Sequence, residues 1–152
     1  MESAIIMLDE NTDQATRQML QKVIEKKRKY ERLKNKHIFS IWTSMIMAVL
    51  LFGYVYYYIV VPYSSSFFTM FSMFVDRFSH FVFLSASIGM YGYMLMVKKK
   101  MDKAEKEYHG LRCEIIDKSK DLWKKEQEWK NRHKVFEMMK SNYDINLYHE
   151  SK

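Results

Sequence analysis

The chain has 152 residues, 48% of them hydrophobic, and its 25 Lys and Arg residues against 18 Asp and Glu give a net charge of +7. A single cysteine excludes an intrachain disulfide framework. No Gly-rich phosphate loop, CxxC, HExxH or GxSxG motif is present, and the five histidines lack metal-ligand spacing. We therefore expect a protein that is not an enzyme and that binds no cofactor and no metal.

Charge is almost absent from the middle of the sequence. Ile38–Val61 and Phe78–Val97 contain no Asp, Glu, Lys or Arg, and only the adjacent pair Asp76 and Arg77 is charged between them. About 20 helical residues cross the ~30 Å hydrocarbon core of a bilayer. The sequence therefore predicts an all-α fold, a two-span transmembrane helical hairpin that continues into long cytoplasmic helices with coiled-coil character.

Five segments follow from this pattern. We expect a cytoplasmic N-terminal basic helix over residues 1–37, a first span over 38–61, an outer connection that is partly interfacial over 62–77, a second span over 78–97, and a cytoplasmic coiled-coil-like helix and tail over 98–152.

The first helix is expected to be long. Thr12 or Asp13 can cap a helix that starts at about Gln14, and no breaker separates this helix from the first span. Proline cannot donate the helical hydrogen bond, and it disfavours helical backbone at the residue before it. We therefore predict one helix of roughly 45–50 residues that ends before Pro62.

Basic residues crowd the ends of both spans. Each basic residue near an anionic membrane surface contributes ~1 kcal/mol, so lipid headgroups are the expected partner. Nucleic acid is not expected, because Glu25, Glu31 and further acidic residues dilute the positive field and no recognition motif is present. The predicted headgroup contacts are Lys26, Lys27, Arg28, Lys29, Arg32, Lys34, Lys36, Lys98, Lys99 and Lys100.

The distribution of basic residues also predicts topology. Of the 25 Lys and Arg residues, 24 lie before the first span or after the second, and Arg77 alone lies in the connection. Positive charge in short flanks stays on the cytoplasmic side. We expect a multi-pass protein of the cell membrane with both termini in the cytoplasm and a first span that is an uncleaved anchor.

Two interpretations of Phe67–Val75 remain open. The segment is either a short amphipathic helix in the outer interface or the start of a long, tilted second span. A charge at the bilayer centre costs ~2.5–3.5 kcal/mol, so the neighbouring Asp76 and Arg77 favour the interface. His80 lies just inside the second span, where we expect it to contact water at the outer surface.

Apolar residues recur with a 3.5-residue period from Val97 to Met139, which is typical of a coiled coil. We expect one helix from the membrane to about Ser141. Three basic residues interrupt this seam, and they either extend along it into water or meet acidic residues of a partner helix. They are Lys118, Lys125 and Arg132.

The distal part of the seam is the candidate partner-binding surface. The N-terminal helix is long enough to cover the seam only to about Leu122, which would leave large apolar side chains exposed. We expect them to bind another copy of the chain or another helical protein. They are Leu122, Trp129, Phe136 and Met139.

Two functions are compatible with these features. The first is a non-enzymatic, membrane-anchored scaffold or interaction module that binds through its cytoplasmic helical stalk. The alternative is a subunit of a small oligomeric channel or transporter, in which polar side chains of the spans line a path. Those side chains are Ser40, Thr43, Ser44, Ser85, Ser87 and His80.

Three stretches of the chain carry a family resemblance. Met7–Thr16 (MLDENTDQAT), Leu111–Trp123 (LRCEIIDKSKDLW) and Asn146–Lys152 (NLYHESK) resemble the YpbF-like proteins of Bacillus and its relatives. The resemblance covers essentially the whole chain. It implies a bacterial cell-membrane protein with two spans and of unknown function, and it offers no catalytic residues.

Overall fold

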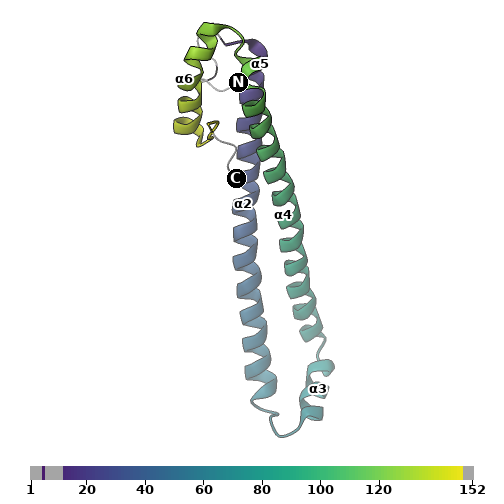
Figure 1. The fold of residues 1–152 in the computed structure, drawn as a ribbon. Coiled ribbons are helices and arrows are strands. Elements are labelled where there is room, and N and C mark those ends of the chain that lie inside the picture. The colour runs from purple at the N-terminus through teal and green to yellow at the C-terminus, as the bar shows by residue number, and fades with distance from the viewer. Residues whose placement is uncertain (1–4, 6–11, 149–152) are drawn as a thin grey trace. The chain divides into compact units, whose positions relative to one another are not determined.

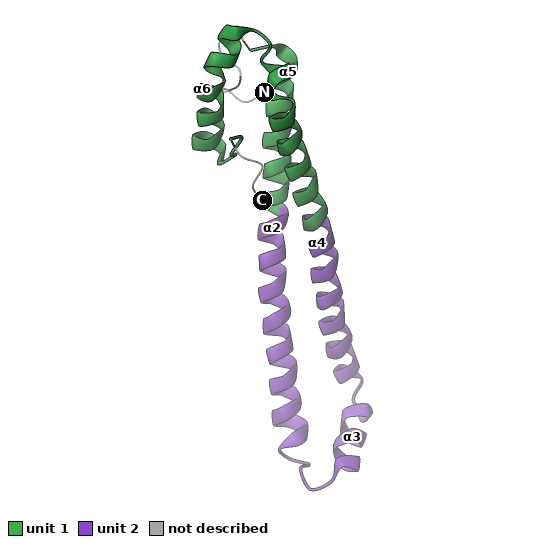
Figure 2. Cartoon of the chain, in the orientation of Figure 1, with its two compact units in different colours: residues 1–32, 102–152 green, residues 33–101 purple. Residues whose placement is uncertain are grey.

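The computed structural model describes Ile5 and residues 12–148, and every regular element of that part of the chain is a helix (Figure 1). The predicted all-α class is thereby confirmed. The chain divides into two compact units (Figure 2): unit 1 comprises residues 1–32 and 102–152, and unit 2 comprises residues 33–101. The outermost residues of both predicted tails lie outside the described residues.

Helix α2 (Gln14–Val55) begins at the predicted residue and continues without a break into a π-helix, η1 (Tyr56–Val60). Together they form a helix of 47 residues. Its last turn is wider than an α-helical turn, because the Val61 N–H donates to the Tyr56 carbonyl, five residues back, at 3.0 Å. The prediction of one long helix that ends before Pro62 is confirmed.

The connection contains a separate short helix, α3 (Phe67–Asp76). Ser66 caps it, with its Oγ accepting a hydrogen bond from the Thr69 N–H at 3.5 Å. Arg77 is extended, with φ −106° and ψ 113°, and it separates α3 from the next helix. The interpretation of this segment as the start of one long second span is therefore wrong. Its placement in a membrane interface stays a prediction.

Two helices of the described chain are long and apolar enough to cross a membrane, α2 with η1 and α4 (Phe78–Asp117). In their most apolar 18-residue windows, only 6% and 11% of the residues are buried. Among the described residues, the exposed large hydrophobic side chains all belong to unit 2, except Tyr148. Unit 2 therefore shows its apolar residues on its surface and does not bury them in a core.

Unit 1 contains a chain reversal that the sequence pattern did not predict. Helix α4 ends at Asp117, a single turn α5 (Ser119–Leu122) follows, and α6 (Glu126–Tyr143) runs back (Figure 1). The predicted continuous helix to Ser141 is wrong. No Gly or Pro marks the reversal, because its backbone angles, such as φ −85° and ψ 10° at Lys118, are accessible to any residue.

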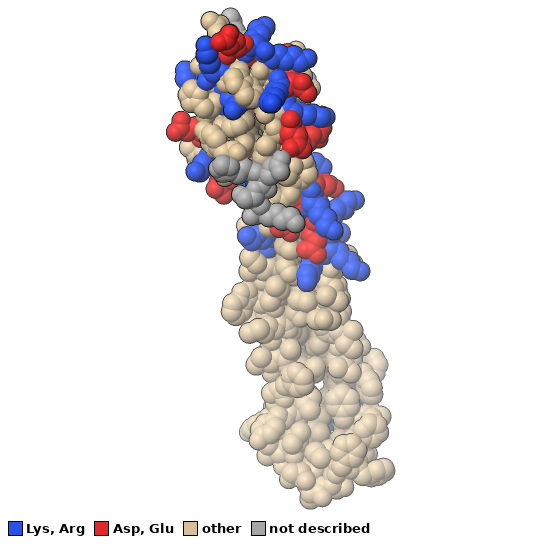
Figure 3. All heavy atoms as spheres, viewed as in Figure 1, with Lys and Arg blue, Asp and Glu red and all other residues tan. Residues whose placement is uncertain are grey.

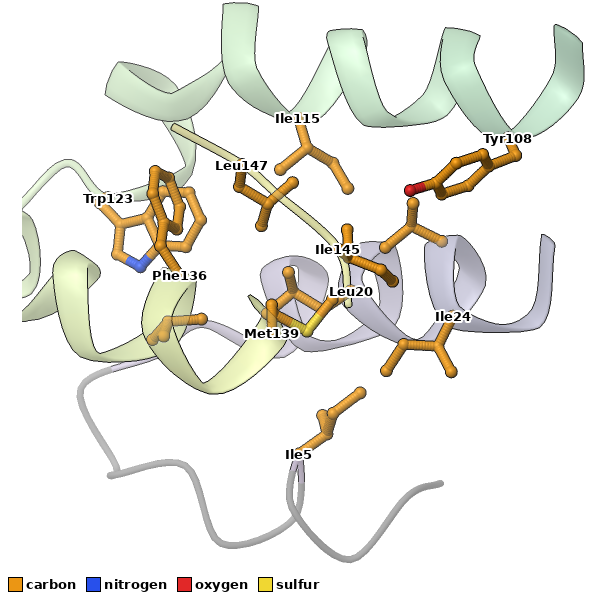
Figure 4. Close-up of a cluster of buried hydrophobic side chains, with 12 residues drawn as sticks. Ile5, Leu20, Ile24, Tyr108, Ile115, Trp123, Phe136, Met139, Ile145 and Leu147 are labelled. Atoms are coloured by element: carbon orange, nitrogen blue, oxygen red, sulfur yellow. The ribbon is translucent and has the colours of Figure 1, made fainter. Parts of the chain in front are cut away.

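The reversal buries the core of unit 1. Burying a large apolar side chain contributes ~1.5–3 kcal/mol, and several such side chains outweigh the cost of interrupting a helix. Figure 4 shows side chains from α2, α4, α6 and the C-terminal segment that point toward one another. The buried residues are Ile5, Leu20, Val23, Ile24, Tyr108, Ile115, Trp123, Val135, Phe136, Met139, Ile145 and Leu147.

Candidate functional site

The residues of the predicted partner-binding seam pack inside unit 1. Phe136 is 5% exposed and Met139 is fully buried, and both belong to the core. Leu122 and Trp129 are partly buried and pack against the same core. The expectation that these four side chains are left uncovered is wrong, because the reversal after Asp117 folds the distal seam back over the N-terminal part of α2.

The three basic residues of the seam find partners nearby in the sequence. Lys118 pairs with Glu114 at 2.7 Å. Lys125 pairs with Glu128 at 3.2 Å, and its N–H donates to the same carboxylate at 3.4 Å, which caps α6. The Arg132 guanidinium lies 3.3 Å from the centre of the Trp129 ring. Each of these basic groups therefore meets a partner of its own chain at most four residues away.

One predicted headgroup contact, Lys27, is buried. Its ammonium donates to the carbonyls of Tyr143 and Asp144 at 2.6 and 2.7 Å, and it lies 3.0 Å from the Asp144 carboxylate. These carbonyls end helix α6, where the helix dipole favours a cation. Lys27 is 8% exposed, so the prediction that it contacts lipid headgroups is wrong. It fastens the end of α6 to α2.

Two neighbouring lysines share one carboxylate in unit 1. Lys26 lies 2.6 Å from Glu107 and Lys29 lies 3.7 Å from it, so α2 and α4 are joined by an ion pair. The hydrogen bond from Lys26 lowers the pKa of Glu107, and the positive charges of Lys26 and Lys29 lower it further. Both ammonium groups keep part of their surface in solvent. Arg28 and Arg32 are exposed as well.

The remaining predicted headgroup contacts form a group at one end of unit 2, which we call the lysine collar. Its five members lie directly beside the uncharged runs of α2 and α4, and all of them are exposed. On the face drawn in Figure 3, charged atoms are confined to unit 1 and this end of unit 2. The collar consists of Lys34, Lys36, Lys98, Lys99 and Lys100.

A groove opens between α2 and α4 next to the lysine collar. It has a volume of about 490 Å³, which is within the range of small-molecule sites. Polar residues lie at its collar end and mostly apolar residues lie beyond them. The lining residues are Asn35, Lys36, Phe39, Ser40 and Thr43 of α2 with Met90 and Tyr93 of α4.

At the connection end of unit 2, His80 joins three helices. The Phe74 carbonyl of α3 can only accept, so the His80 Nδ1 donates to it at 2.8 Å. The His80 Nε2 shares a second hydrogen bond with the Tyr54 hydroxyl of α2 at 3.0 Å. His80 is 4% exposed, so the expectation that it contacts water is wrong. The position of an ionisable group in a span was the only feature of the sequence that could have indicated this burial.

Several hydroxyl groups assigned to a channel path are used within their own helices. Ser40 donates to the His37 carbonyl at 2.8 Å, and Thr43 donates to the Phe39 carbonyl at 2.9 Å. Ser87 of α4 likewise donates to a carbonyl four residues back at 2.9 Å. Each of the three hydroxyl groups therefore donates its proton within its own helix, and the helix surface around it is apolar.

The potential metal ligands of the chain do not gather. Among the described residues, no three His, Cys, Asp or Glu side chains are grouped so that they could hold a metal ion. Cys113 is a free, half-buried thiol beside a surface hollow of about 750 Å³ that His109 also lines. His109 lies 4.0 Å from Glu105, which is the outer limit of an ion pair.

Two comparisons with known proteins each found a match that covers most of the chain. A family model described as a protein of unknown function, DUF2663, matches residues 19–150. An uncharacterized protein of Bacillus subtilis (strain 168), YpbF, is 38% identical to this chain over 152 residues, which is the full length of both proteins. The YpbF-like resemblance noted in the sequence is confirmed. No solved structure matches the chain.

Proposed function

The chain belongs to the DUF2663 family, whose function is unknown, and from this premise we propose that it is a non-enzymatic integral membrane protein that anchors a small helical domain, unit 1, as a scaffold at the cytoplasmic face of the cell membrane. The observation that carries the proposal is the apolar surface of unit 2. Phe39 and Phe52 of α2 are 73% and 72% exposed, and Ile88 of α4 is 63% exposed. In water such a surface would aggregate, whereas in a bilayer it meets hydrocarbon.

The lysine collar supports an orientation with both termini in the cytoplasm. Its five ammonium groups lie at the level where the uncharged runs of both helices end, and the cytoplasmic leaflet carries anionic headgroups. Asp76 is the only acidic residue between positions 33 and 101, and it lies beyond the first span, at the connection. Within unit 2, no acidic side chain near the collar in the sequence therefore offsets its positive charge.

The scaffold role rests on unit 1. This unit has its own hydrophobic core, and its surface is rich in both basic and acidic side chains (Figure 3). We assign partner binding to that surface, because the seam residues Phe136 and Met139 are already enclosed. The partner is another copy of the chain or another helical protein, and interfaces of this polar kind suit reversible association.

A labelling experiment tests the orientation. In a Cys113→Ser background, a cysteine at Ser65 in the connection should react with a membrane-impermeant maleimide added to intact cells. A cysteine at the exposed Ser141 of α6 should react only after the cells are permeabilised. Labelling of Ser141→Cys in intact cells, with Ser65→Cys protected, would reverse the orientation. Recovery of the protein in the soluble fraction would refute membrane anchoring.

A second experiment tests the scaffold role. Lysine-reactive crosslinking in native membranes, read by mass spectrometry, should give intermolecular links from exposed lysines of unit 1, such as Lys120 and Lys124. The same lysines in protein unfolded by detergent serve as the control for random collision. If links from unit 1 are all intramolecular at native abundance, the scaffold role is wrong.

A further inference from the structure

We propose that the groove between α2 and α4 binds an anionic glycerophospholipid, with one acyl chain along the groove and the phosphate against Lys36. The inference rests on the proposed function, because it requires unit 2 to lie in a bilayer. It adds a defined binding site and a ligand class to a general attraction between basic residues and a membrane surface.

The order of residues along α2 matches the two parts of a lipid. Asn35 and Lys36 lie at the collar end, and Phe39, Ser40 and Thr43 follow along the helix. From Lys36 to Thr43 the helix rises about 10 Å, so the groove passes from the charged level into the depth expected for hydrocarbon. A molecule with a charged head and an apolar tail fits this sequence of surfaces.

The walls of the groove are suited to an acyl chain. The hydroxyl groups of Ser40 and Thr43 donate hydrogen bonds to carbonyls of their own helix, so they do not need a hydrogen-bond acceptor from a ligand. Ser40 is 5% exposed, which places it at the floor. Phe39 of α2 with Met90 and Tyr93 of α4 provide the apolar sides. A hydrocarbon tail would therefore leave no polar group of the wall unpaired.

Charge complementarity selects an anionic headgroup. Lys36 is exposed at the mouth of the groove, and Lys98, Lys99 and Lys100 close the same end of unit 2 from α4. The nearest acidic residues in the sequence, Glu31 and Asp102, are outnumbered by the five collar lysines, so the collar keeps a net positive charge that attracts a phosphate. A zwitterionic headgroup brings an ammonium group along with its phosphate, and the collar would repel it.

Tryptophan quenching by brominated lipids provides the test. The full-length protein is reconstituted with Phe39→Trp in a Trp42→Phe background, and the emission of Trp123 and Trp129 is subtracted with the Trp42→Phe protein. Brominated phosphatidylglycerol should quench the new tryptophan at about a fivefold lower mole fraction than brominated phosphatidylcholine, the ratio that corresponds to the ~1 kcal/mol of one basic residue beside a headgroup with net negative charge. The wild-type Trp42, which does not line the groove, should show a weaker preference.

Three variants separate the groove from the surface charge. Lys36→Gln should reduce the preference to the weaker level shown by Trp42, and Thr43→Leu, which narrows the groove, should reduce quenching by both lipids. Lys100→Gln, a collar residue outside the groove, should keep most of the preference. Equal quenching by the two lipids, or equal losses in Lys36→Gln and Lys100→Gln, would overturn the inference. Cysteine labelling measures membrane insertion independently. If the groove does not bind the lipid, the proposed function is therefore not contradicted.

Discussion

Replacing Phe136 by alanine is expected to destabilise unit 1 by about 3–5 kcal/mol, the usual cost of deleting a buried phenyl ring. The ring is 5% exposed and makes edge-to-face contacts with Trp123 and Tyr148, with centroid distances of 5.5 and 5.4 Å. Its loss would leave a cavity beside Trp123 in the core shown in Figure 4, where neighbouring side chains from several elements cannot all collapse inward.

Hydrogen exchange of the full-length protein in detergent measures this loss. Protection of the slowest amides of α6 should fall by roughly two to four orders of magnitude in Phe136→Ala. Phe68→Ala is the matched control, since Phe68 is 80% exposed on α3 in unit 2 and should leave α6 unchanged. If Phe136→Ala keeps wild-type protection in α6 but loses association with a partner, the side chain is an interface residue and the described core is wrong.

Replacing Lys27 by methionine is expected to cost about 2–3 kcal/mol, because the ammonium provides charged hydrogen bonds at the C-terminus of α6. Methionine replaces the unbranched apolar part of the lysine side chain and lacks only the ammonium group, so the loss is mainly that of the charge. The carbonyls of Tyr143 and Asp144 would lose their donor at 2.6 and 2.7 Å. Asp144 has a left-handed backbone with φ 52°, so the turn after α6 depends on such contacts.

The expected signature is local. Amides of residues 139–148 should exchange faster in Lys27→Met, while those of α2 in unit 2 should not change. Lys22→Met is the control, since Lys22 is exposed one turn earlier on the same helix. A comparable effect in both variants would show that lysine charge in this region acts through its general field. The assignment of Lys27 to the end of α6 would then be contradicted.

The buried face of α2 shows why the site could be predicted only in part. Lys26 and Lys27 were both predicted to contact headgroups, but the structure buries Lys27 together with Leu20 and Ile24, whereas Lys26 keeps part of its surface in solvent. Adjacent positions on a helix lie about 100° apart, so an error of one residue turns a different lysine inward. All five residues of the lysine collar are exposed, because charge beside an apolar span needs no tertiary partner to stay in water, and their contact with lipid headgroups stays a prediction.

The sequence by itself determined the two long apolar helices, the end of the first before Pro62 and the group of lysines beside them. Uninterrupted apolar runs and Pro62 act through local backbone geometry and through the solvent that each residue requires. Only the tertiary structure decided the reversal after Asp117, because Thr16 meets Leu122 and Lys27 meets Asp144 across more than a hundred residues. It also decided the burial of His80 between Tyr54 and Phe74. A periodic pattern reports which residues share a face, whereas which faces then meet depends on packing between distant segments.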